Sequence, residues 1–193
     1  MKILLDMDDV MVDLIGPWLD YLNNKHGSNI SKDDVFCWDM NECVLPKLLE
    51  CDAEENIHIF EPLFIPEFWD NVKPLEGAVD AIKELNEKHS IYIATASHHN
   101  TFGPKIEKCL LKYFPFISEK QIICIYRKEL IDAGILIDDN YDNIEKFALS
   151  SGNKSGILMN APYNKDMSIK NTPLWNKVFR VDNWNDIIRF FNL

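Results

Sequence analysis

The sequence predicts an α/β fold, a doubly wound parallel sheet with a small, mainly helical cap inserted after the first strand. Short apolar runs alternate with segments of helical periodicity over most of the chain, which favours parallel strands joined by right-handed crossovers. One region interrupts this alternation with short helical pieces, many acidic residues and scattered aromatic residues. We therefore expect a core made of residues 1–13 and 74–193, and a cap made of residues 14–73.

The elements of the core follow from periodicity and from their end signals. Lys2–Leu5 reads as a buried strand, and Ile15, Trp18, Leu19 and Leu22 have helical spacing before a plausible stop at Gly27. A later helix is expected to start at Pro104, because proline suits a first helical turn, and to end near Tyr113. The remaining expected strands are 90–94, 121–125, 134–137, 156–159 and 178–181, and the remaining helices are one from Gly77 onward, 142–150 and 185–191.

Composition limits the class of protein. The 193 residues are 47% hydrophobic and 26% charged, which fits one core domain with a modest insertion. The net charge of −11 argues against a nucleic acid polymer or an anionic membrane as partner, since both need a basic surface. The five cysteines form no C-x-x-C pair, so we expect free thiols in a reducing, cytoplasmic environment. The sequence leaves the oligomeric state open, with a homodimer as one alternative.

Acidic residues follow two of the expected strands. Asp6 and Asp8 come directly after the first strand, two residues apart, so their side chains start on the same face of an extended segment. Asp138 and Asp139 follow the strand at 134–137. In a parallel sheet Asp6, Asp8 and Asp138 meet at one edge, where the repulsion of three carboxylates calls for a hard, oxygen-ligated cation such as Mg²⁺.

Each of these features taken alone has an ordinary structural explanation. A D-x-D pair arises by chance in a chain with 31 acidic residues, and acids after strands often cap helices. A single threonine or lysine carries no information. Their combination, with Thr95 ending the second strand and Lys128 preceding Asp138, indicates a site that handles phosphate.

At these positions the chain resembles the haloacid dehalogenase-like phosphatases. The likeness rests on DMDDV, on the IYIAT strand, on Lys128 and on ILIDD. Within that superfamily the chain is similar to the 5′(3′)-deoxyribonucleotidases, through DMDDVMVDL, PLEGAVDAIKEL, KYFPF, RKELIDAGILIDDN and GILMNAPYN. The resemblance implies a Rossmann-like fold, Mg²⁺ as cofactor and a small phosphate monoester, a deoxynucleoside monophosphate, as substrate.

The resemblance also implies a role for each acidic residue. Asp6 would be the nucleophile that forms an aspartyl-phosphate, and Asp8 would act as general acid and then as general base. Mg²⁺ would be held by the carboxylates of Asp6 and Asp138 and by the backbone carbonyl of Asp8. Asp139 would act on the metal through water.

The implied phosphate-binding groups are Thr95, the amide of Ala96 and Lys128. A further lysine is expected on the helix after the second strand, and Lys105 stands one residue out of that register. Ala96 replaces a small hydroxyl residue, and Asp9 stands where the family often has glycine. His98 and His99 either line the entrance of the site or lie exposed.

Four aromatic residues of the cap are candidates for the substrate pocket: Phe36, Trp38, Phe68 and Trp69. They either stack on a base, since every base has a π-face, or form the small core of the cap.

Three alternatives to a nucleotidase stay open. The nearest is a phosphatase of the same mechanism that acts on another small phosphate monoester. A signalling receiver domain also carries acids, a hydroxyl residue and a lysine at strand ends, but it lacks the second acid two residues after the first, and the insertion. A non-catalytic phosphate-binding protein is disfavoured because every catalytic position is present.

Overall fold

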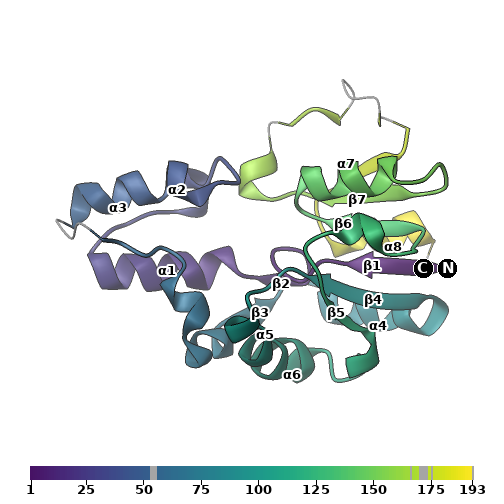
Figure 1. Cartoon of the computed structure of the whole chain (residues 1–193), viewed down its shortest axis with the longest axis horizontal. Helices are drawn as coiled ribbons and strands as arrows, with labels where there is room; N and C mark the ends of the chain where they lie inside the picture. The colour runs from purple at the N-terminus through teal and green to yellow at the C-terminus, as the bar shows by residue number, and fades with distance from the viewer. Residues whose placement is uncertain (53–55, 166, 170–173, 175, 193) are drawn as a thin grey trace.

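Six parallel strands form a single sheet in the computed structural model, which describes residues 1–52, 56–165, 167–169, 174 and 176–192 (Figure 1). The strand order is β5-β4-β1-β6-β7-β8. The bounds are β1 Lys2–Leu5, β4 Ser90–Thr95, β5 Ile122–Cys124, β6 Ile135–Asp138, β7 Ser155–Met159 and β8 Val178–Val181. The predicted α/β class is confirmed. Among the described residues, none of the helices combines the length and apolarity that a membrane crossing requires.

Alternate side chains of the strands face two separate apolar layers, which is why the sheet is covered on both sides. Ile3 and Leu5 of β1 pack in one cluster with α4 (Ala78–Lys88) and α8 (Trp184–Phe191). Leu4 points the other way, into a cluster with α7 (Tyr141–Leu149). Because successive side chains of a strand point to opposite faces, an all-apolar run such as this one stabilises only a strand buried on both sides.

The central position of β1 places its carboxyl end in the middle of the sheet edge. β1 pairs with β4 on one side and with β6 on the other. The pairing continues one residue beyond the strand, since the amide of Asp6 donates to the carbonyl of Ile137 at 2.9 Å. This hydrogen bond to β6 therefore fixes the backbone of Asp6, from which its side chain projects.

A helical arm, which we define as residues 14–72, extends from the sheet on the side away from the two chain termini (Figure 1). Its described elements are the helices α1 (Ile15–His26), α2 (Met40–Cys43) and α3 (Leu45–Cys51) and the 3₁₀ segments η1 (Lys32–Asp34), η2 (Glu61–Phe64) and η3 (Pro66–Asp70). Helix α1 ends where predicted, at Gly27, whose φ of 64° is a left-handed conformation suited to glycine. A short antiparallel pair that the sequence did not predict, β2 (Val12–Asp13) with β3 (Lys73–Pro74), closes the base of the arm.

The core of the arm is continuous with one face of the sheet. Trp18, Val44 and Leu48 belong to the same buried cluster as Ile3 and Leu5. The division of the chain into a core domain and a cap domain stays a prediction, because packing joins the two regions on this side.

The helix after β4 begins earlier than the sequence predicted. It starts as α5 (His99–Lys105), passes through a π-helical turn, η4 (Ile106–Leu110), and ends as α6 (Leu111–Tyr113). The expected start at Pro104 was wrong because the side chain of His98 caps the helix, accepting from the amide of Asn100 at 3.3 Å. Pro104 therefore lies inside the helix, where it has no N–H to donate, and the π turn follows directly.

The contact between β7 and α7 leaves no room for a side chain at Gly156. A Cβ atom there would lie 2.5 Å from Cγ2 of the buried Ile144, so we expect Gly156→Ala to lower the free energy of unfolding by about 1–3 kcal/mol. Gly152→Ala is the matched control, because a Cβ there meets nothing within 4 Å. Urea denaturation of the two variants measures the difference, and equal stabilities would contradict this packing.

Candidate active site

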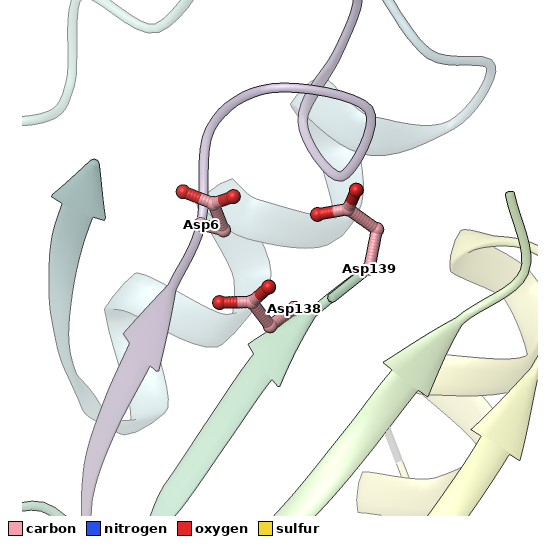
Figure 2. Close-up of side chains that lie close together, drawn as sticks. All are labelled: Asp6, Asp138 and Asp139. Atoms are coloured by element: carbon pink, nitrogen blue, oxygen red, sulfur yellow. The ribbon is translucent and has the colours of Figure 1, made fainter. Parts of the chain in front are cut away.

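Three carboxylates converge at the carboxyl edge of the sheet. Asp6 follows β1, Asp138 ends β6 and Asp139 is the next residue (Figure 2). One oxygen from each lies within 4.8 Å of the others, and all three residues are buried. The sequence predicted that the carboxylates of Asp6, Asp8 and Asp138 converge, and this is correct for Asp6 and Asp138. Asp139 takes the place expected for Asp8, whose carboxylate pairs with Lys105 instead.

Lys128 supplies the positive charge that this cluster needs. Its Nζ lies 2.8 Å from Oδ1 of Asp6 and 2.6 Å from Oδ2 of Asp138, and the side chain is 2% exposed. Burial lowers the pKa of Lys128, but the charges of the two aspartates outweigh burial and hold that pKa above its usual value. The ammonium group therefore stays charged. Lys154 stabilises the segment that carries Lys128, because its Nζ donates to the carbonyls of Glu129 at 2.9 Å and Ile131 at 2.8 Å.

Asp138 is held in place by the start of α7. Its Oδ1 accepts from the amide of Asn140 at 2.9 Å, and both of its oxygens accept from Nδ2 of Asn143 at 3.2 Å. Sequence reasoning missed Asn143. Its position could have indicated its role. Asn143 lies three residues after Asn140, the N-cap of a helix that begins at the site, and residues three apart share one face of a helix.

The cluster carries more negative charge than its protein partners balance. Burial raises the pKa of Asp138 to about 6, against the opposing effect of Lys128. Burial and the charges of Asp138, Asp6 and Asp9 raise the pKa of Asp139 well above its usual range. Among the residues that the structure describes, Oδ1 of Asp139 is buried without a hydrogen-bond partner. An unpaired oxygen beside two further carboxylates suits a hard divalent cation, which prefers oxygen ligands.

The carboxylate of Asp8 lies apart from this cluster, beside a second buried lysine. Lys105 forms an ion pair with Oδ2 of Asp8 and donates to Oγ1 of Thr95 at 2.7 Å. Lys105 is 1% exposed, and its Nζ lies 5.5 Å from the ring centroid of Trp69. The residue that stood out of register in the sequence is therefore in the site. Burial raises the pKa of Asp8, although Lys105 opposes the shift.

The conformation and hydrogen bonds of Asp9 account for an aspartate at a position where the family often has glycine. Its φ of 52° is left-handed, a conformation that glycine adopts freely and that aspartate tolerates better than most residues. Its Oδ1 accepts from the amides of Leu14 at 3.1 Å and Ile15 at 3.2 Å, so it caps the start of α1. Burial raises the pKa of Asp9 to about 7.

A cavity of about 220 Å³ opens over Asp8. Polar residues around Lys105 form one part of its wall, and apolar residues of the arm form another. Its lining residues are Asp8, Leu14, Phe60, Leu63, Phe64, Trp69, Ala96, Ser97, His98, Thr101, Lys105 and Tyr126. His98 thus lines the cavity, and the centroid of its ring is 5.4 Å from that of Phe64. His99 is exposed and is absent from the described lining.

Only Trp69 of the four aromatic candidates lines this cavity in the described part of the chain. Phe36 and Trp38 are 65% and 55% exposed, and Phe68 is buried edge-on against Trp69. Sequence reasoning missed Phe60 and Phe64. Nothing in their local sequence separates them from other aromatic residues of the arm, because their position depends on how the arm folds back over the sheet.

Removal of Lys128 is expected to destabilise the protein strongly. Lys128→Met leaves two buried carboxylates unpaired, so the free energy of unfolding without metal should fall by about 3 kcal/mol or more. Lys2→Met is the matched control, since it removes an ion pair in which Asp132 is 95% exposed. Urea denaturation measures both, and a similar small loss in the two variants would contradict the role given to Lys128.

Comparisons with known proteins show the family to which the chain belongs. Residues 1–191 match the model of the family described as 5′ nucleotidase, deoxy (Pyrimidine), cytosolic type C protein. A 5′(3′)-deoxyribonucleotidase of Bacillus subtilis is 31% identical over 191 residues, which cover 97% of this chain and 96% of that protein. A 5′(3′)-deoxyribonucleotidase of Clostridium acetobutylicum is 33% identical over 161 residues, covering 83% of this chain and 82% of that protein.

Solved structures share the fold. The magnesium-bound HAD-hydrolase YfnB from Bacillus subtilis superimposes with a TM-score of 0.65 at 18% identity, covering 100% of this chain and 98% of that one. The resemblance seen in the sequence is thereby confirmed. The described geometry, the family match over nearly the whole chain and the curated relatives lead to one conclusion: the chain belongs to this haloacid dehalogenase-like 5′-nucleotidase family and is a phosphoric monoester hydrolase.

Proposed function

We propose that the chain is a magnesium-dependent nucleotidase that hydrolyses deoxynucleoside 5′- or 3′-monophosphates through an aspartyl-phosphate on Asp6. The observation that carries this proposal is the cavity over Asp8. It joins a charged end, with Asp8 and Lys105, to an apolar end with Phe60, Phe64 and Trp69. A nucleotide has the same two ends, a phosphate and a base.

The metal would be held by the carboxylates of Asp6 and Asp138 and by the backbone carbonyl of Asp8. Asp139 would contribute through water or directly, since its carboxylate lies in the same cluster and its Oδ1 has no hydrogen-bond partner among the described residues. Magnesium, when bound, supplies the positive charge that lets a carboxylate and a phosphate dianion approach each other. The other groups in the mechanism belong to the chain itself.

In the first step, an oxygen of Asp6 attacks phosphorus and the bond from phosphorus to the sugar oxygen breaks. Asp8 gives its proton to that leaving oxygen, which would otherwise depart as a poor alkoxide leaving group. The raised pKa of Asp8 favours the protonated form that this step needs. The product is a nucleoside, and the phosphoryl group stays on Asp6.

In the second step, Asp8, now ionised, takes a proton from water as the water oxygen attacks the phosphoryl group. The bond between Asp6 and phosphorus breaks, which releases inorganic phosphate and restores both carboxyl groups. Two easier steps thus replace one difficult displacement.

Positioning of the phosphoryl oxygens falls to Thr95, the amide of Ala96, Lys128 and Lys105. Charge neutralisation and orientation dominate phosphoryl transfer, so fixed donors matter more than further reactive groups. Lys128 and Lys105 are both buried and already held by carboxylates, which reduces the reorganisation needed when substrate arrives.

The nucleoside assignment rests on the apolar end of the cavity and on the names of the relatives. The nearest alternative, a phosphatase of another small monoester, would use the same chemistry with a different pocket. The proposal also places the enzyme in the cytoplasm, because all five cysteines are free thiols.

The substrate is tested by comparing released phosphate from deoxynucleotides and from sugar phosphates. We expect kcat/KM at least tenfold higher for deoxynucleotides, which needs only about 1.4 kcal/mol of differential binding. Phe64→Leu should reduce this preference by weakening stacking, whereas the control Phe179→Leu, at an exposed aromatic residue of β8, should keep it. Equal or better rates on sugar phosphates would discard the nucleotidase assignment and leave the phosphatase chemistry standing.

The division of roles between Asp6 and Asp8 is tested with p-nitrophenyl phosphate, whose leaving group needs little protonation. Asp8→Asn should slow nucleotide hydrolysis by about 10²–10⁴-fold. It should still release a burst of nitrophenol, followed by slow turnover because the base for the second step is missing. Asp6→Asn should give no burst. If Asp8→Asn reduces the nitrophenol burst rate as much as the nucleotide rate, the acid–base role lies elsewhere.

A further inference from the structure

A tyrosine outside the catalytic motifs holds one oxygen of Asp139. The hydroxyl of Tyr163 donates to Oδ2 of Asp139, whose carboxylate belongs to the cluster with Asp6 and Asp138, and Oδ1 has no hydrogen-bond partner among the described residues. Because the two carboxylate oxygens lie on opposite sides of the same group, engaging one of them determines where the other points. No step of the proposed mechanism uses this hydroxyl.

The turn that carries Tyr163 is firmly attached to the sheet. It is a 3₁₀ segment, η7 (Pro162–Asn164), just after β7. The buried Asn164 donates from Nδ2 to the carbonyls of Asp139 at 2.8 Å and Met159 at 2.9 Å. Arg180 of β8 donates to the side chain of Asn164 at 3.2 Å and to its carbonyl at 2.9 Å. The turn that carries Tyr163 is therefore hydrogen-bonded to the backbone of Asp139, the residue whose side chain Tyr163 contacts.

The helical arm reaches the same turn. The ring of Trp38 packs edge-on against Tyr163, with centroids 5.1 Å apart and planes at 83°. Lys165 directly follows the turn, and its Nζ lies 3.1 Å from Oδ1 of Asp33 in the arm. In Figure 1 the start of α2 accordingly lies beside the yellow-green turn that follows β7. Trp38, which does not line the cavity over Asp8, thus has a contact of its own at the metal side of the site.

We propose that Tyr163 is a positioning residue that orients Asp139 toward the metal, and that Trp38 supports its ring from the arm. This inference rests on the proposed magnesium site. Partners that hydrogen-bond to a metal-binding carboxylate orient it, and their loss typically weakens metal affinity by about 10–100-fold. The arm would then contribute to both ends of the site, through Trp69 at the cavity and through Trp38 at the metal.

The test is a magnesium titration of the thermal unfolding midpoint, without substrate. In the wild type, binding of the metal to the folded state raises the midpoint. Tyr163→Phe removes the hydroxyl and keeps the ring, so we expect the concentration giving half of the rise to increase about tenfold. At saturating magnesium, KM for the substrate should stay unchanged. Tyr21→Phe is the matched control, because it removes a tyrosine hydroxyl 3.4 Å from Glu61, within the arm.

Trp38→Leu should shift the half-point in the same direction by a smaller factor, and Trp38→Phe, which keeps an aromatic edge, should stay close to the wild type. An unchanged half-point in Tyr163→Phe overturns the inference, and an unchanged half-point in Trp38→Leu overturns the part given to Trp38. A wild type that shows no magnesium-dependent shift at all would instead contradict the proposed metal site.

Discussion

Negative charge crowded into a buried sheet edge is the constraint on which the rest of this structure depends. Asp6, Asp138 and Asp139 approach one another because parallel strands deliver their carboxyl ends to one place. Burial makes each charge costly, and the raised pKa values of Asp138 and Asp139 record that cost. Cations that share the space offset this cost, so Lys128 contributes to the fold as much as to the site, and the proposed metal would do the same.

Two buried lysines divide the site into halves with different carboxylate partners. Lys128 bridges Asp6 and Asp138, on the side where the metal would bind. Lys105 bridges Asp8 and Thr95, on the side where the proposed general acid lies. Asp6 and Asp8, only two residues apart, therefore face different sets of charges, as the different roles proposed for them require. The backbone turn at Asp9 connects the halves and starts α1, so the catalytic loop and the arm share one anchor.

The arm meets the sheet edge on two sides of this site. Phe64 and Trp69 line the cavity over Asp8, and Trp38 contacts Tyr163 next to Asp139. Its buried residues join the same apolar cluster as β1, so movement of the arm as a whole would disturb the core. One segment therefore contacts both the proposed substrate cavity and the proposed metal site, through residues that are far apart in the sequence.

The sequence by itself determined the sheet, its covered faces and the meeting of Asp6 with Asp138. These features depend on side-chain alternation within single strands and on where each strand ends, which are local properties. The start of α5 was missed because a histidine side chain, rather than the proline, caps it. Only the tertiary structure decided that Lys105 reaches Asp8, that Phe60 and Phe64 line the cavity while Phe36 does not, and that Tyr163 holds Asp139. Each of these contacts joins segments that pack from different directions, and neither periodicity nor residue type specifies which distant partner a side chain will meet.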